Sequence, residues 1–121
     1  MSVQQNHYEI IGAKFGYNEF HKELMAAKGL TEEEVEDLLD DYHDSAFKGI
    51  QHHNGLCIIC DGMNGEYVYV GHILQKSGNY GRIGEFKSQG KNPSAKAVRK
   101  MMVDQLGLDR PCRRCAFTHY R

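Results

Sequence analysis

The segment from Glu66 to Gln75 constrains the fold of this chain more than any other feature. A β-strand presents alternate residues to opposite faces, and here both faces are largely apolar, so the strand has to be covered on both sides. The preceding loop, residues 61–65, contains two Gly and one Asn, which suit a tight turn back to an earlier strand at Leu56–Cys60. The pattern predicts a hairpin whose second strand lies centrally in a sheet and alternates two sets of side chains: Tyr67, Tyr69, Gly71 and Ile73, then Val68, Val70, His72 and Leu74.

Helix-capping residues mark three further segments. Asn18 is a suitable N-cap and Gly29 a suitable left-handed C-terminal residue for the first helix. Thr31 with Glu34 forms a capping box for the second helix, and Gly107 is expected to end the third. The predicted helices run from Glu19 to about Lys28, from Thr31 to about Phe47, and from Pro93 to about Leu106.

The two ends of the chain complete the expected fold. Residues 7–16 are rich in β formers and predict a first strand, and Arg82–Phe86 predicts a short strand after the hairpin. Asp109 ahead of Pro111 predicts a short terminal helix. The chain has 121 residues, 40% of them hydrophobic, which suits one globular domain over residues 1–121. The expected class is α+β: an antiparallel sheet of about three to four strands packed against two to four helices, which should also bury Tyr67 and Tyr69. The alternative is that the face with Tyr67 and Tyr69 is exposed beside the basic C-terminal half and stacks bases.

Charge is distributed unevenly along the chain. Residues 1–75 carry four Lys against thirteen acids, 4 − 13 = −9, whereas residues 76–121 carry eleven basic residues against three acids, 11 − 3 = +8. Such asymmetry favours an anionic partner for the basic part. The alternative is that the two parts fold against each other and largely neutralise.

Two Cys-x-x-Cys pairs use all four cysteines of the chain: Cys57 with Cys60, and Cys112 with Cys115. Four thiolates suit a tetrahedral zinc ion, and a two-residue spacing lets one tight turn present two of them. The order of first pair, hairpin and helix-borne second pair predicts a treble-clef-like structural zinc site. Two alternatives remain open: the thiols pack as small hydrophobic groups in a core strand, or one pair has a redox role.

Short segments around these cysteines resemble in part the zinc-containing HNH nucleases. The resemblance rests on the two cysteine pairs, the Gly71-His72-Ile73-Leu74 segment and His119. It implies a treble clef around a catalytic metal, with His72 as the general base that activates water. The chain departs from that family at Gly71, where the family has Asp, and at Ala116, where a polar residue is usual, so no catalytic residue is assigned.

Three classes of function follow from these patterns. The first is a non-enzymatic module, an adaptor, inhibitor or accessory protein, that docks a protein partner through an acidic helix face at Glu36, Asp40 and Asp44. The second is a nucleic-acid-binding protein whose cations contact phosphates. The third is the HNH-like nuclease. The residues assigned to the nucleic-acid interface are Lys96, Arg99, Lys100, Arg113 and Arg114.

The sequence also bears on location. No apolar run approaches the length of about 20 residues that crosses a bilayer, and the N-terminal residues lack a basic and apolar signal. We therefore expect a cytoplasmic protein without a membrane partner.

Overall fold

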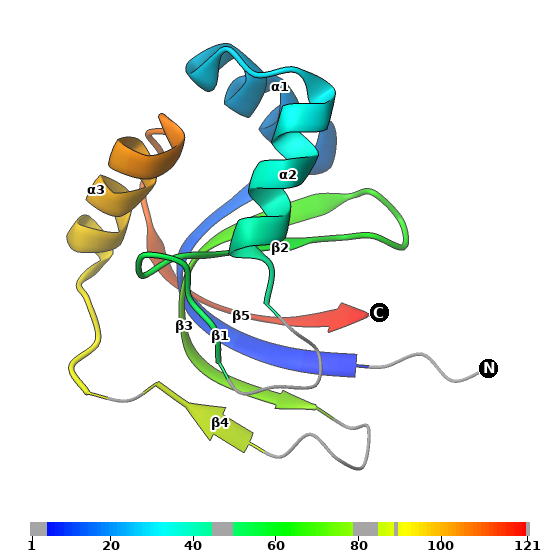
Figure 1. Ribbon diagram of the computed structural model, residues 1–121. Coiled ribbons are helices and arrows are strands. Elements are labelled where there is room, and N and C mark those ends of the chain that lie inside the picture. The colour runs from blue at the N-terminus through cyan, green and yellow to red at the C-terminus, as the bar shows by residue number, and fades with distance from the viewer. Residues whose placement is uncertain (1–4, 45–49, 79–84, 89, 121) are drawn as a thin grey trace.

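The computed structural model describes residues 5–44, 50–78, 85–88 and 90–120. This part of the chain forms five strands and three helices (Figure 1). In chain order they are β1 (Gln5–Gly16), α1 (Tyr17–Lys28), α2 (Glu32–Tyr42), β2 (Cys57–Cys60), β3 (Tyr67–Gly78), β4 (Glu85–Lys87), α3 (Ala95–Leu106) and β5 (Arg113–Tyr120). The predicted α+β class with an antiparallel sheet is confirmed.

The strands form one antiparallel sheet in the order β2-β3-β1-β5, and β4 pairs with the far end of β3 beyond β2. β3 has β1 along one edge and β2 and β4 along the other, so the strand predicted to be central is central. β5 pairs with β1 only from Gln5 to Gly12. Residues 13–16 of β1 therefore have no strand beside them on that edge within the described part of the chain.

The sheet bends sharply where Gly12 of β1 pairs with Gly71 of β3. The register places Tyr67 opposite Gly16 and His119 opposite Asn6, ten residues apart along β1, which in a flat sheet would be roughly 33 Å. Instead the Tyr67 hydroxyl lies 2.8 Å from His119 Nδ1. Figure 1 shows β1 and β3 curving round, so that the two ends of β3 lie on the same side of the molecule.

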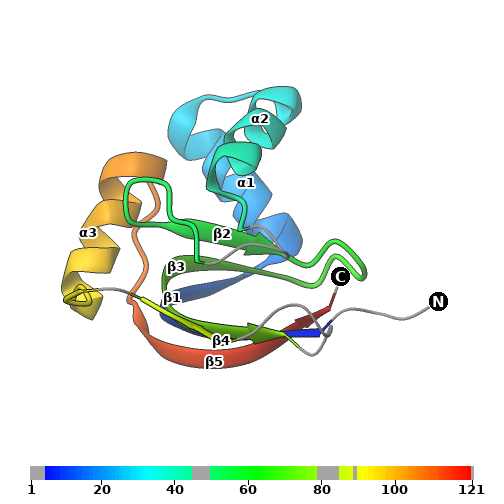
Figure 2. The same ribbon diagram turned by 60° about the horizontal axis from the view of Figure 1, so that its bottom comes forward.

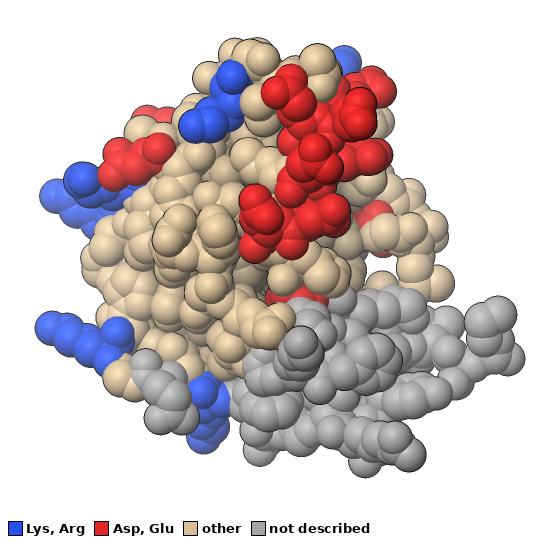
Figure 3. Space-filling model, viewed as in Figure 1, with Lys and Arg blue, Asp and Glu red and all other residues tan. Residues whose placement is uncertain are grey.

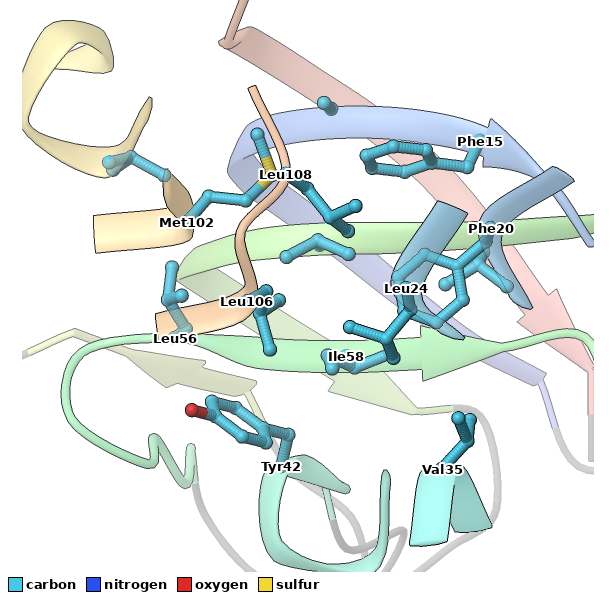
Figure 4. Close-up of a cluster of buried hydrophobic side chains, with 14 residues drawn as sticks. Phe15, Phe20, Leu24, Val35, Tyr42, Leu56, Ile58, Met102, Leu106 and Leu108 are labelled. Atoms are coloured by element: carbon cyan, nitrogen blue, oxygen red, sulfur yellow. The ribbon is translucent and has the colours of Figure 1, made fainter. Parts of the chain in front are cut away.

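The bend divides the sheet into two arms that face each other. The first arm comprises β2 with residues 12–16 and 67–71, and the second comprises β5 and β4 with residues 5–11 and 72–78. All three helices pack on the outer face of the first arm (Figures 1 and 2). They form the larger core, which includes Phe15, Phe20, Leu24, Ile58, Val68, Val70, Met102 and Leu106 (Figure 4).

A second core fills the space between the arms. Its buried apolar members are Tyr8, Ile10, Cys57, Ile59 and Ile73. Next to them lies an ion pair between Lys76 Nζ and Asp44 Oδ2 at 2.8 Å, and both side chains are 0% exposed. The Tyr8 hydroxyl donates to the same carboxylate at 2.8 Å. A charged pair is tolerated inside a fold when further hydrogen bonds satisfy it, as this one is.

Most predicted caps are confirmed. Thr31 and Glu34 form the capping box of α2, and Gly29 and Gly107 take left-handed conformations after α1 and α3. The N-cap of α1 is Gly16 rather than Asn18, because the strand runs directly into the helix. α2 ends at Tyr42. Its predicted continuation towards Phe47 is wrong for His43 and Asp44, whereas Phe47 itself lies outside the described residues, as does the start of the strand predicted from Arg82.

The predicted terminal helix is wrong, because the chain forms β5 there. The local signal, Asp109 ahead of Pro111, is a helix cap only when the following residues have no better partner. Here they pair with β1 in a regular antiparallel ladder, and this pairing over more than 100 residues of sequence overrides the local preference.

No helix in the described part of the chain combines the length and apolar character needed to cross a bilayer.

We predict that Gly71→Ala disrupts the bend. A Cβ atom at Gly71 would lie 2.3 Å from the carbonyl oxygen of Ile11, and one at Gly12 would lie 2.1 Å from that of Val70. Backbone atoms cannot rotate away as a side chain does, so we expect either variant to lose about 3 kcal/mol or more of unfolding free energy. Chemical denaturation measures the loss.

The control is Gly62→Ala, because nothing lies within 4 Å of a Cβ at that turn residue. Its stability should change by no more than about 0.5 kcal/mol. Equal denaturation midpoints for Gly71→Ala and Gly62→Ala would show that the close approach of the two strands is not required.

Candidate functional site

Each cysteine pair is divided between the two cores. Cys57 faces the second core, whereas Cys60 packs against the larger one. Cys115 lies with the second core and Cys112 with the larger one. Cys57 and Cys60 are three apart in a strand and point to opposite faces, and Cys112 and Cys115 lie against different cores, so neither pair presents two thiolates to one ion.

The predicted treble-clef-like zinc site is therefore not supported by the structure. No group of three or more His, Cys, Asp or Glu within the described residues is arranged to hold a metal ion. Burial raises the pKa of Cys60 to about 11, which favours the neutral thiol over the thiolate that zinc binds. The alternative interpretation, thiols packed as small hydrophobic groups in a strand, agrees with the burial of Cys57 and the partial burial of Cys60.

His72, the general base implied by the nuclease resemblance, has structural neighbours instead of a metal centre. Its Nδ1 lies 2.9 Å from the carbonyl oxygen of Gly55, and its ring stacks on His52 at 4.0 Å between centroids. His52 Nε2 accepts a hydrogen bond from the backbone N–H of Ile73 at 2.9 Å, and burial lowers the pKa of His52 to about 4. The stacked rings and their hydrogen bonds tie His52 and Gly55 to β3, and the nuclease interpretation gains no support.

The acidic face predicted on the second helix is present on α2, with one correction. Glu36 and Asp40 are exposed, whereas Asp44 is 1% exposed and paired with Lys76. The three residues are four apart, but α2 ends before Asp44, so the helical spacing does not extend to it. Figure 3 shows acidic side chains gathered over this helix. Among the described residues, none of the following exposed carboxylates makes an ion pair: Glu32, Glu33, Glu34, Glu36, Asp37, Asp40 and Asp41.

The five cations predicted to bind nucleic acid lie on two different elements. Lys96, Arg99 and Lys100 lie on α3, where Arg99 pairs with Asp109 at 2.6 Å and Lys100 with Asp104 at 3.1 Å. The Arg99 side chain lowers the pKa of Asp109. Arg113 and Arg114 lie at the start of β5 and line a groove with other cations. The predicted interface is therefore split between α3 and β5, and its β5 residues lie in a groove with two further cations, Lys14 and Arg110.

This basic groove lies where β5 begins beside β1 and has a volume of about 480 Å³. Its charged side chains are all cationic: Lys14, Arg110, Arg113 and Arg114. The remaining lining residues are neutral and include Tyr69, and no carboxylate lines the groove. The groove exists because β5 stops pairing at Gly12, so that the following residues of β1 form one wall.

Two of the four cations are held by carboxylates. Arg110 binds Glu19 and Glu23 of α1, each at 3.1 Å, donates to the carbonyl oxygen of Lys14, and lies over the ring of Phe15 at 3.9 Å. Arg114 binds Glu9 through its guanidinium. These contacts fix the walls of the groove and compensate the charge of both arginines.

Lys14 and Arg113 have no carboxylate partner within the described residues. Lys14 Nζ lies 5.8 Å and 6.0 Å from the ring centroids of Tyr69 and Tyr67. Burial raises the pKa of Tyr69, and the nearby charge of Arg113 opposes that shift. The side chains of Lys14 and Arg113 are both exposed, so an anion entering the groove meets two positive charges that no described carboxylate compensates.

Sequence reasoning missed Lys14 and misplaced the tyrosines. Lys14 lies in the strand predicted over residues 7–16. Because Lys14 and Phe15 point to opposite faces of that strand, Lys14 should face away from the apolar side, and this pattern could have identified it. Tyr67 and Tyr69 were expected beneath the helices. They lie instead on the opposite face of the sheet, only partly buried, because Val68 and Val70 face the helices.

We predict that the four thiols react in two classes. Cys60, Cys112 and Cys115 are partly exposed and should react with a thiol reagent in the folded protein, whereas the buried Cys57 should react only as the protein unfolds. A chelator should change neither the reaction rates nor the melting temperature. Absorbance during thiol titration, with and without a chelator, measures this. One equivalent of zinc per chain, whose removal exposes all four thiols together, would contradict the core assignment.

The described residues thus contain one groove in which uncompensated cations meet an aromatic side chain, and one acidic helix without ion pairs. No protein family, no curated protein and no solved structure matches this chain.

Proposed function

We propose that this protein is a non-enzymatic binding module that holds a nucleic-acid strand by its phosphates in the basic groove. The observation that carries the proposal is the pair Lys14 and Arg113, two exposed cations in the basic groove. Within the described residues, neither has a carboxylate partner and no carboxylate lines the groove. Cations of this kind release counterions when they neutralise phosphates, and this release drives most sequence-independent binding to nucleic acid.

The lining of the groove supports a polymer over a compact small molecule. The surface of the groove is more polar than apolar, and its cations come from β1, from the residue before Pro111 and from β5. Small-molecule sites are mostly apolar, and they bury most of their ligand. The groove instead offers positive charge from both strands that border it, which suits the phosphates of a nucleic-acid strand. The acidic surface of α2 repels a polyanion and so favours binding at the groove.

We predict that Lys14→Gln combined with Arg113→Gln weakens nucleic-acid binding about tenfold at moderate salt, because two phosphate contacts are lost. The slope of log K against log salt should fall by about 1.4 for a single strand, at about 0.7 for each contact. Fluorescence anisotropy of a labelled oligothymidine over a salt series measures both quantities.

The matched control is Lys96→Gln combined with Lys100→Gln, which removes the same charge from α3. It should leave the slope nearly unchanged. Equal losses in the two double variants would indicate that net charge alone governs binding, and the groove would then not be the interface.

A second candidate function is the docking of a protein partner that presents a basic surface to α2. One observation favours it: a groove of about 400 Å³ in which Leu30 and Leu38 supply apolar contact and Glu34, Asp37 and Asp41 supply carboxylates. These carboxylates have no ion-pair partner in the described part of the chain, so their charge is available to a partner. Apolar contact surrounded by charge is the usual composition of a protein interface.

We predict that Asp37→Lys and Asp41→Lys each reduce the affinity for such a partner about tenfold or more, because like charges would then face each other. Glu66→Lys, also an exposed charge reversal but outside α2, should leave it unchanged. The measurement is capture of a partner from nuclease-treated lysate, followed by titration of the purified partner. A partner lost equally with all three variants, or lost with Lys14→Gln and Arg113→Gln, would rule out α2 as its docking surface.

A further inference from the structure

We infer that the groove selects single-stranded nucleic acid, because one unpaired base stacks on the ring of Tyr69 while Lys14 and Arg113 hold the neighbouring phosphates. The inference rests on the proposed function and names its ligand class. Tyr69 lines the groove together with the two cations, so that ring and charges face the same space.

The ring of Tyr69 is held in a fixed orientation. Phe117 of the opposite arm stacks on one of its faces, with ring centroids 3.7 Å apart and planes 3° from parallel. Tyr67 approaches edge-on, with centroids 5.4 Å apart and planes at 65°. A rigid aromatic ring loses little conformational entropy when a base stacks on it, so the stacking energy is retained as affinity.

The other face of Tyr69 is covered by Lys14. Phe117 occupies one face at van der Waals distance, so the ammonium, 5.8 Å over the ring, lies over the opposite face. This distance is near the outer limit of a cation–π contact, and the Lys14 side chain is exposed. The covering group is thus the most easily displaced one in the cluster. When a base takes its place on the ring, the ammonium moves to a phosphate of the same strand.

A duplex cannot use this arrangement. Its bases are stacked on one another, so only phosphates, sugars and base edges reach a protein surface. A single strand can turn a base out of its own stack, and base–aromatic stacking is tolerant of sequence because every base has a flat face. A groove that combines cations with one available ring face therefore favours the single strand.

The test compares three ligands of equal length with the intact protein: oligothymidine, the same strand with abasic residues, and a duplex. The abasic strand keeps every phosphate and lacks the bases. We expect it to bind at least about fivefold more weakly than oligothymidine, the lower end for one stacked base. The duplex should also bind more weakly than oligothymidine at the same salt concentration.

Two variants at Tyr69 locate the effect. Tyr69→Leu keeps an apolar side chain but loses the ring, and should bind oligothymidine and the abasic strand equally. Tyr69→Phe keeps the ring and should retain the difference. The abasic comparison uses the unaltered protein, so the test remains decisive if Tyr69→Leu does not fold.

The outcomes separate the two proposals. Equal binding of oligothymidine and the abasic strand, both dependent on Lys14 and Arg113, would overturn base stacking and leave phosphate binding in place. Stronger binding of the duplex would do the same. Binding of all three ligands that is unaffected by Lys14→Gln with Arg113→Gln would overturn the proposed function and the inference with it.

Discussion

The close approach of β1 and β3 at Gly12 and Gly71 determines the rest of the structure. With no side chain on either residue, the two backbones come near enough for the sheet to fold back on itself. The bend creates two interiors from one sheet, because the outer face of the first arm packs against the helices while its inner face meets the second arm. Within the described part of the chain, residues 13–16 of β1 also have no strand on the edge where β5 pairs, and they form one wall of the basic groove.

Ion pairs between distant parts of the chain then decide which charges remain available. Arg110 and Arg114 from the basic part bind Glu19, Glu23 and Glu9 from the acidic part, and Lys76 binds Asp44 in the interior. The two oppositely charged parts of the sequence therefore neutralise each other in part, as one of the two interpretations of the charge pattern required. Among the described residues, the charges that remain without an ion pair include the carboxylates of α2 and two cations of the groove, Lys14 and Arg113. Each place is suited to a ligand of opposite charge.

Local patterns predicted the elements well where the signal was complete within a few residues. The capping box at Thr31, the left-handed glycines after α1 and α3, and the hairpin with its central strand are of this kind. The cysteine spacing was misleading because two residues between thiols suit a metal only in a turn, and here the first pair lies in a regular strand. The second pair was expected on a terminal helix, but the chain forms β5 there. Two cations of the groove, Arg113 and Arg114 of β5, were among the residues predicted to bind nucleic acid, whereas Lys14 and Tyr69 were not.

The sequence by itself determined the local patterns: which residues alternate, where α2 begins, where α1 and α3 end, and that β3 needs cover on both faces. These are properties of neighbouring residues, and backbone geometry dictates them directly. Only the tertiary structure decided that Tyr69 meets Phe117, that β5 pairs with β1, and that Asp44 is buried with Lys76. Such contacts join residues tens to more than a hundred positions apart. They follow from the bend at two glycines, whose effect on the path of the sheet no local pattern records.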